Sequence, residues 1–457
     1  MRKEEELSTL REELSKLQEA LQSVREENRV LKEQLAAAHK RIEELEKQKT
    51  PPAFVKANVV KPQENEKKTR KKRDPEHNRA RQREEPTQII AHPIECCPDC
   101  GGRLSAQHVA RHRQVLEIAP PPPVEVIEHQ VYRGWCSYCR RWREAPLDLS
   151  QEVLGQGRLG VGLASVIAYL RMVLRMPIRL IRQYLQSLHG LKVSVGEITE
   201  LLHRISKQSE ATVQALREQA RASPVVHADE TGWRENGRNG YVWVLATADG
   251  LRYFEYHHSR AGEVVSTLLG KKFKGVLISD FYGGYNDYAC PHQRCWVHLL
   301  RDLHDLKEKQ AKQEEVVTWA KQVKALYEQA VASKVAGLAE EERQAAYVQL
   351  VSDAKQLGAQ YAQAKKHPCQ ALARRLLRHQ DELFQFVLRP EVPAHNNLAE
   401  RSIRPLVVTR KISGGSRSPK GSATRMTLAS LFGTWLARQL NPLEQCRLLL
   451  SLKSPLP

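Results

Sequence analysis

The sequence predicts a multidomain protein in which an α/β core is combined with several α-helical units. Three observations support this expectation. Apolar residues repeat in heptads over the first 49 residues, residues 224–300 change to the patterns of β-strands, and the segments flanking this core are rich in helix-forming residues. The 457-residue chain is also too long for one compact core. We therefore expect several folding units along the chain.

The charge and cysteine content narrow the class of protein. The chain has 72 Lys and Arg against 53 Asp and Glu, a net charge of +19, which favours a polyanion such as nucleic acid as partner over a merely soluble surface. Nine cysteines, four of them in two C-x-x-C pairs, fit metal binding in a reducing cytosol better than disulfides. Neither a signal peptide nor a membrane span is predicted. We expect a cytoplasmic, nucleoid-associated protein without a membrane partner.

Residues 1–49 have the pattern of a coiled coil that joins two or more copies of the chain. Setting Leu7 at heptad position a also places Asn28 at an a position, where a buried Asn favours a parallel dimer in one register. The alternative is a helix packed along its own chain. The apolar positions of the repeat are Leu7, Leu10, Leu14, Leu17, Leu21, Val24, Leu31, Leu35, Ala38, Ile42 and Leu45.

Residues 50–93 are predicted to form a basic, disordered tether. The segment begins with Thr50-Pro51-Pro52, which ends the helix, and it contains the basic run 67–73 with few apolar residues to bury. Such a segment either follows DNA phosphates or serves as a solvated spacer.

Residues 94–146 are predicted to form a zinc ribbon. Cys97, Cys100, Cys136 and Cys139 form two C-x-x-C turns, which together can place four thiolates around a structural Zn²⁺. An unmetallated or redox role is the alternative. Between the two turns, residues 109–118 and 124–133 are expected to form the strands of an extended hairpin.

Residues 153–222 are predicted to be helical, with helices over 159–174, 177–189 and 195–205. A helix, a short Gly-containing turn and a second helix are compatible with a helix-turn-helix, in which Arg179 and Arg182 would face DNA. Ordinary three-helix packing explains the same pattern.

Residues 224–300 have the strand order of a ribonuclease-H-like core. Strands are expected at 225–229, 241–247, 251–257 and 276–279, with a helix before the last. The first and fourth strands are neighbours in that arrangement, so Asp229 and Asp280 at their ends would lie side by side. An all-α insertion over 301–390 would interrupt the core, and residues 391–457 would complete it with Glu400 and C-terminal helices.

Three carboxylates in a basic surrounding suggest phosphodiester chemistry. Asp229, Asp280 and Glu400 can hold two Mg²⁺ or Mn²⁺ ions, which activate an oxygen nucleophile and stabilise the leaving oxygen. Glu230 and Asp287 are the nearest rivals, and strand alternation would point Glu230 to the opposite side. The basic residues expected to bind DNA near Glu400 are Arg401, Arg404, Arg410, Lys411, Arg417 and Lys420.

The chain resembles the insertion sequence 66 family of bacterial DDE transposases. Four separated stretches carry the resemblance: His227–Trp233, Ser279–Tyr285, Cys295–Arg301 and Asn397–Pro405, the last followed by Arg410-Lys411. The coiled coil, the cysteine ribbon and the helical insertion fit the order of that family.

The resemblance implies that Asp229, Asp280 and Glu400 bind two metal ions. It also implies that the enzyme recognises terminal inverted repeats, nicks double-stranded DNA at the element ends, and joins the 3′-OH ends to target DNA. A dimer or larger synaptic complex is implied, and small companion proteins from the same element are common partners in the family. The i, i+3 spacing of Cys295 and His298 is able to bind metal, but with no second pair assigned we expect His298 to be a packing or site-edge residue.

Two other functions remain open from the sequence. One is a DNA-binding scaffold without catalysis, such as a decayed transposase. The other is a metal-dependent nuclease that hydrolyses DNA without strand transfer.

Overall fold

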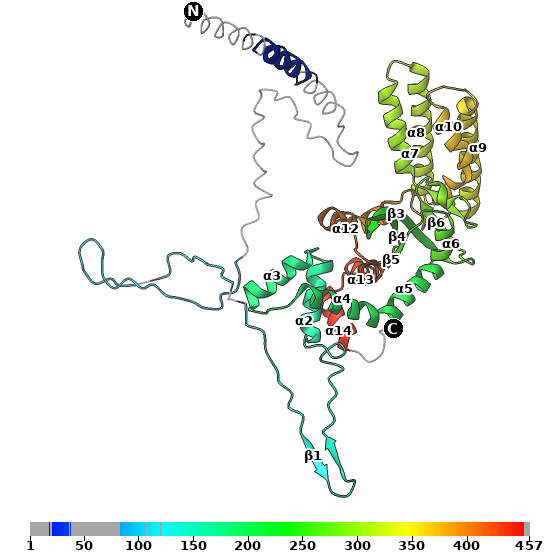
Figure 1. Cartoon of the computed structure of the whole chain (residues 1–457). Helices are drawn as coiled ribbons and strands as arrows, with labels where there is room; N and C mark the ends of the chain where they lie inside the picture. The colour runs from blue at the N-terminus through cyan, green and yellow to red at the C-terminus, as the bar shows by residue number, and fades with distance from the viewer. Residues whose placement is uncertain are drawn as a thin grey trace, which may run out of the picture. The chain divides into compact units, whose positions relative to one another are not determined.

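The computed structural model of the chain describes residues 18, 21–35, 37, 83–106, 108–118 and 121–451. The chain divides into two compact units, Met1–Glu117 and Ile118–Pro457, and each is considered by itself (Figure 1). Within the described ranges, the helices lack any apolar stretch of the length needed to cross a lipid bilayer.

The first unit contains a helix over residues 21–35. Its heptad positions Leu21, Val24, Leu31 and Leu35 are 52, 51, 60 and 58% exposed, so the apolar stripe has no partner within this part of the chain. Arg29 forms ion pairs with Glu26 and Glu33 on the same helix. The rest of the predicted coiled coil and residues 50–82 of the predicted tether lie outside the described residues. Residues 83–93 contain neither helix nor strand.

The second unit begins with a two-stranded antiparallel hairpin of β1 (Arg133–Cys136) and β2 (Arg141–Glu144). Trp135 pairs with Trp142 across the hairpin, with ring centroids 5.9 Å apart. The prediction of longer strands at 109–118 and 124–133 is wrong, since only Arg133 of those residues is in a strand. The β-branched residues that suggested strands, such as Val115 and Val126, are 78 and 88% exposed and have no packed layer to hold them extended.

Four helices follow: α2 (Val161–Met172), α3 (Ile178–His189), α4 (Val195–Gln208) and α5 (Glu210–Ala222). The first three are as predicted to within a few residues. Gly190 ends α3 in the left-handed conformation, at φ 66°, where a residue without Cβ is unstrained. Ser194 and Glu197 form a capping box at the start of α4. The sequence therefore specifies both ends of this short connection.

A five-stranded mixed sheet forms the centre of this unit, in the order β5-β4-β3-β6-β7. Its strands are β3 (Val225–Glu235), β4 (Arg238–Ala246), β5 (Arg252–His257), β6 (Val276–Ser279) and β7 (His292–Arg294). The predicted neighbours β3 and β6 pair in parallel from Val225↔Val276 to His227↔Ile278, so this adjacency is confirmed. The predicted end of the first strand at Asp229 is wrong, because antiparallel pairing with β4 continues β3 through Glu235.

The two faces of the sheet pack against different helices. Val226, Ala228 and Leu245 face a core shared with α2–α5 and with α6 (Glu263–Leu269). Val242 and Val244 face the other way and pack against α12 (Asn397–Ser413) and α13 (Pro419–Ala437). Figure 1 shows α12 and α13 beside β3–β5.

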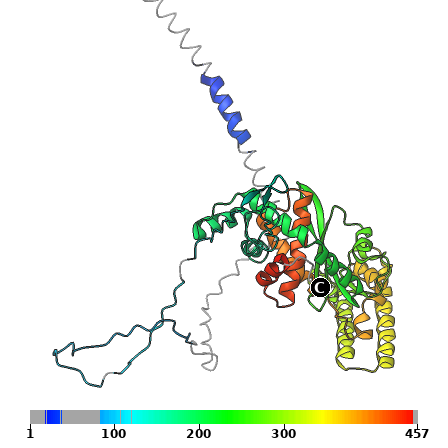
Figure 2. The ribbon, with the colours of Figure 1, turned by 90° about the horizontal axis from the view of Figure 1, so that it is seen from below.

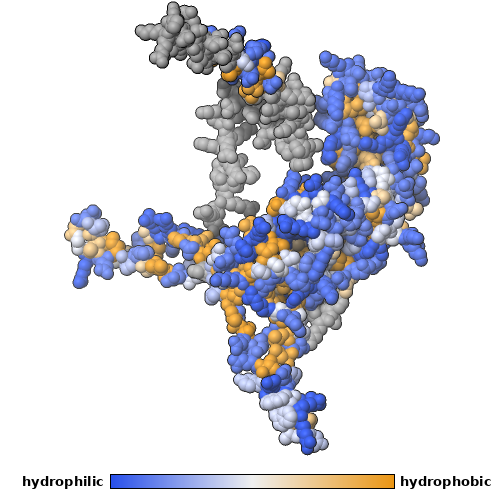
Figure 3. Space-filling model, viewed as in Figure 1, coloured by the Kyte–Doolittle hydropathy of each residue, from blue (hydrophilic) through white to orange (hydrophobic). Residues whose placement is uncertain are grey.

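A helical bundle interrupts the core after β7, as the sequence predicts. It consists of α7 (Trp296–Lys309), α8 (Glu314–Val335), α9 (Glu340–Ala362), α10 (Gln370–Arg378) and α11 (Gln385–Leu388). Val276 and Ile278 of β6 join the core of this bundle, which extends from one end of the sheet (Figure 2). The face of the bundle seen in Figure 3 is mostly hydrophilic, with a few apolar patches. The chain continues through α12 and α13 to α14 (Pro442–Ser451), which packs on α2.

Candidate active site

The pleat of the sheet brings Asp229 and Asp280 to the same face. Ala228 and Leu277 face the α2–α6 core. Asp229 is one residue after Ala228 and Asp280 is three residues after Leu277, so by strand alternation both aspartates point to the opposite face. Asp229 and Asp280 each lie two residues beyond His227 and Ile278, the last pair of the parallel register. The Asp229 Oδ1 accepts from the Glu230 amide at 2.9 Å, and the Asp280 Oδ1 accepts from the Tyr282 amide at 2.9 Å.

Glu230 points to the other side of β3, as strand alternation predicts. Its carboxylate, 2% exposed, accepts from Arg260 Nη2 at 2.6 Å and from the Tyr285 hydroxyl at 2.5 Å. Burial raises the pKa of Glu230, while these two hydrogen bonds lower it in part. With both oxygens already engaged, Glu230 supports the strand and does not compete with Asp229 as a ligand. Asp287, the other rival, is exposed beyond the 3-10 turn Gly283–Tyr285.

Asn396 fastens the start of α12 to the strand that carries Asp229. It is 1% exposed, and its Nδ2 donates to the Ala228 carbonyl at 2.8 Å. Burial lowers the pKa of His227 to about 4, so its neutral ring donates through Nδ1 to Asn396 Oδ1 at 3.1 Å. Asn396 is the N-cap residue of α12, but its side chain bonds β3 and does not cap the helix. This anchor holds Glu400, one turn into α12, beside the sheet.

The three predicted acids influence one another electrostatically. Burial, followed by the neighbouring charges of Glu230, Asp280 and Glu400, raises the pKa of Asp229 to about 7. Mutual repulsion of this kind is reduced when a cation binds, and carboxylate oxygens are the ligands that Mg²⁺ prefers. The carboxylate oxygens of these three acids therefore fit a hard divalent ion.

The buried ion pair of Arg294 and Glu382 holds the backbone of Asp280 in place, and the sequence did not predict it. Arg294 on β7 is fully buried; its Nη1 donates to the Asp280 carbonyl at 2.9 Å and its Nε to Glu382 at 2.5 Å. His379 also bonds Glu382 at 2.8 Å. Burial raises the pKa of Glu382, but the hydrogen bond from His379 and the charge of Arg294 outweigh it and lower the pKa to about 2. The one sequence feature that could have indicated this ion pair is the position of Arg294 directly before Cys295.

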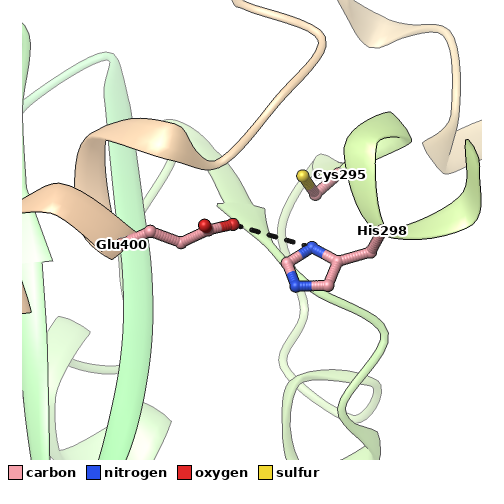
Figure 4. A group of neighbouring side chains, drawn as sticks. All are labelled: Cys295, His298 and Glu400. Carbon is pink, nitrogen blue, oxygen red and sulfur yellow. Dashed lines mark ion pairs between the residues drawn. The ribbon is translucent and has the colours of Figure 1, made fainter. Parts of the chain in front are cut away.

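A second cluster contains the third acid. Cys295 Sγ, His298 Nδ1 and a carboxylate oxygen of Glu400 all lie within 4.8 Å of one another, with the three side chains converging from α12 and from the start of α7 (Figure 4). It is the one group of three such ligand atoms among the residues that the structure describes. Asp229, Asp280 and Glu400 thus share one electrostatic neighbourhood without closing around a common point.

Some of the residues predicted to contact DNA have exposed side chains, and others bond neighbouring parts of the protein. The exposed ones are Arg179 and Arg182 on α3 together with Arg401, Arg404, Lys411 and Arg417. Arg410 bonds Thr231 and the Gly232 carbonyl of β3, and Lys420 pairs with Glu200 at 3.2 Å. Arg410 therefore ties α12 to the sheet. The DNA contacts themselves stay predictions.

The cysteine pairs of the predicted zinc ribbon fall in different compact units. Backbone N–H groups of Cys100 and Asp99 lower the pKa of Cys97, and the Cys139 amide, 3.3 Å from Cys136 Sγ, lowers the pKa of Cys136. Each turn thus favours the thiolate that binds metal. A shared Zn²⁺ stays a prediction.

Comparisons with known proteins agree with the arrangement of these motifs. Residues 156–424 match the sequence model of a family described as "Transposase IS66 family". Two uncharacterised proteins of Sinorhizobium fredii (strain NBRC 101917 / NGR234) are similar to this chain. The protein y4jO is 43% identical over 14% of this chain and 20% of its own length, and y4qI is 23% identical over 56% and 52%. The chain thus spans about half or less of the length of these curated relatives.

Proposed function

The chain belongs to the IS66 transposase family, and we propose that it is a metal-dependent DNA transposase. It binds the terminal inverted repeats of an insertion sequence, cleaves the element ends and joins the 3′-OH ends to target DNA. The observation that carries the proposal is the parallel pairing of β3 and β6, which places Asp229 and Asp280 on one face of the sheet. Glu400 approaches the same face from α12.

The roles of the chain's own residues follow from this geometry. Asp229, Asp280 and Glu400 would hold two Mg²⁺ or Mn²⁺ ions, which supply activation of the attacking oxygen and stabilisation of the leaving oxygen. Asn396 and His227 keep Glu400 beside the sheet, and Arg294 fixes the backbone of Asp280. Such preorganisation matters because the acids must be placed before the reaction begins.

The partners of the enzyme are proposed on the same basis. Double-stranded DNA, as element end and as target, would follow the exposed arginines of α3 and α12. Two or more copies would meet through the heptad helix, and small companion proteins of the same element would take part. The core is proposed to be ribonuclease-H-like, supported by the strand order β5-β4-β3-β6-β7.

The test is cleavage and joining of end DNA in Mg²⁺ by Asp229→Asn, Asp280→Asn and Glu400→Gln. We expect each change to lower cleavage at least about 100-fold, the scale of losing one group that stabilises transition-state charge. Asp287→Asn and Glu391→Gln alter exposed acids and serve as matched controls that retain activity. Cleavage that persists in all three site variants would make the catalytic assignment wrong. Nicks without any joined product from the wild type would favour a nuclease instead.

A further inference from the structure

The Cys295, His298 and Glu400 cluster contains two buried polar atoms that make no hydrogen bond. His298 Nδ1 and Glu400 Oε1 are both inaccessible to solvent, and neither has a hydrogen-bond partner among the described residues. They face each other at 3.8 Å, too far for an N–H···O bond (Figure 4). Buried polar atoms in folded proteins nearly always have a partner. The gap between these two atoms therefore calls for something to bind both.

The donor types identify what fits between them. A thiolate, an imidazole nitrogen and a carboxylate oxygen are zinc ligands, whereas Mg²⁺ avoids sulfur. Zinc bonds of about 2.0–2.3 Å place tetrahedral ligand atoms about 3.3–3.6 Å apart. The 3.8 Å between His298 Nδ1 and Glu400 Oε1 is close to this spacing, and all three ligand atoms lie within 4.8 Å. Small side-chain movements would complete the coordination.

The surroundings of Cys295 also suit a bound thiolate. The residue is the N-cap of α7 and is fully buried. Its Sγ accepts a hydrogen bond from the backbone N–H of Asn396 at 3.2 Å. Burial raises the pKa of Cys295, and the backbone N–H groups of Asn396, His298 and Val297 oppose that rise. When a metal ion binds, the thiol proton passes to solvent and the ion's charge compensates the buried thiolate.

We propose that Cys295, His298 and Glu400 form a coordination site for a transition-metal ion of the zinc class, with a fourth position open to water. The site differs in donor chemistry from the all-carboxylate cluster of Asp229 and Asp280. Plain packing, with an ion pair of 3.8 Å between a protonated His298 and Glu400, would leave both buried atoms without a hydrogen bond.

Glu400 belongs to both sets of ligands, and this gives the site a regulatory consequence. An ion on Cys295 and His298 holds the carboxylate toward α7, so zinc competes with the catalytic use of Glu400. This consequence rests on the proposed transposase function, whereas metal binding itself does not. Zinc is then an inhibitor of end cleavage even when Mg²⁺ is in excess.

Binding is tested on the full chain with Co²⁺ as the probe, because a cobalt–thiolate bond gives a charge-transfer band in the near ultraviolet. We expect the wild type to bind one ion more than Cys295→Ser, with a stronger charge-transfer band. His298→Ala should weaken binding of that ion at least about 10-fold. As controls, Cys290→Ser removes a thiol five residues earlier in the chain, and His304→Ala removes an exposed imidazole of α7. Both variants should match the wild type.

Circular dichroism of each variant establishes that it is folded, and His298→Ala provides the comparison if Cys295→Ser does not fold. Equal Co²⁺ stoichiometry and equal spectra in the wild type and both site variants would overturn the proposal. Loss of the ion in the control variants as well would also overturn the proposal.

Inhibition is tested by titrating Zn²⁺ into end cleavage at constant Mg²⁺. The concentration that halves the rate should rise at least about 10-fold in Cys295→Ser relative to wild type, each rate being normalised to the same variant without zinc. Unchanged sensitivity would overturn the competition. If the wild type cleaves no end DNA, the proposed function fails, and the Co²⁺ measurement still decides whether the site exists.

Discussion

Two adjacent acids, Asp229 and Glu230, have opposite roles because successive side chains of a strand face opposite sides of the sheet. Glu230 is buried with Arg260 and Tyr285 as partners. Asp229 is buried among like charges, with its pKa raised to about 7. Two hydrogen bonds therefore offset part of the burial cost of Glu230, whereas the charges around Asp229 add to its burial cost. Acids kept at such a cost are typical of functional sites.

Asp229→Asn should stabilise the metal-free protein at pH 8. The unfolded chain releases this proton near pH 3.8 and the folded chain near pH 7, so folding stability falls as pH rises through this window and the loss is complete above it. Removing the charge should raise the free energy of unfolding by on the order of 1 kcal/mol. Urea unfolding measures this. Mg²⁺ should stabilise the wild type more than the variant; an equal effect on both would contradict Asp229 as a ligand.

Glu382 should make the protein sensitive to acid. Its folded-state pKa of about 2 lies below the ordinary 4.5, so its contribution to stability is complete above pH 4.5 and is lost as pH falls toward 2. Glu382→Gln should cost about 3 kcal/mol at pH 7, because Arg294 is left buried without its counter-charge. The variant's stability should then vary less with pH between 4.5 and 2 than that of the wild type. An unchanged pH profile relative to Glu391→Gln, at an exposed position, would count against this role.

At the scale of elements, apolar patterns predict which segments are strands but not how far each extends. The buried run Val276–Ser279 and the neighbouring pair β3 and β6 follow from the sequence. The length of β3 does not, because residues 230–235 are extended by pairing with β4. β7 is short and polar, yet fully buried, because Arg294 finds its counter-charge in Glu382, 88 residues later. Such distant pairings leave no local pattern.

Asn396 is the connection between elements on which the placement of Glu400 depends. Asn396→Ala should leave the His227 ring and the Ala228 carbonyl without their bonds, at a cost of about 2 kcal/mol or more. End cleavage should also fall, although all three acids remain. Thermal unfolding and cleavage assays measure the two effects, with Asn397→Ala as the neighbouring control. Full activity in Asn396→Ala would show that α12 does not need this anchor.

At the scale of the whole molecule, the heptad helix is predicted to join copies of the chain. Its apolar stripe is exposed in a single copy, where the Asn28 amide bonds the Val24 carbonyl at 3.0 Å. In a parallel dimer two such amides would meet and fix the register. Asn28→Leu should therefore keep the helix but broaden the distribution of oligomers. Sedimentation velocity measures this, and a monomeric wild type would contradict the dimer.

The sequence therefore predicts the three candidate acids but not the residues that hold them in position. Asp229, Asp280 and Glu400 are recognisable because Asp229 lies in an apolar strand, Asp280 directly follows one and Glu400 lies in the first turn of a helix. The bonds of Asn396, the ion pair of Arg294 with Glu382 and the approach of Glu400 to His298 each join residues at least 88 positions apart in the chain. These contacts appear only when the elements have packed.

The most direct test of the central claim is a crystal structure of the full chain with end DNA and Mn²⁺, located by anomalous scattering. We expect anomalous peaks within coordination distance of the Asp229, Asp280 and Glu400 carboxylates, beside the scissile phosphate. Mn²⁺ bound only at sites away from all three carboxylates, with DNA in place, would contradict it.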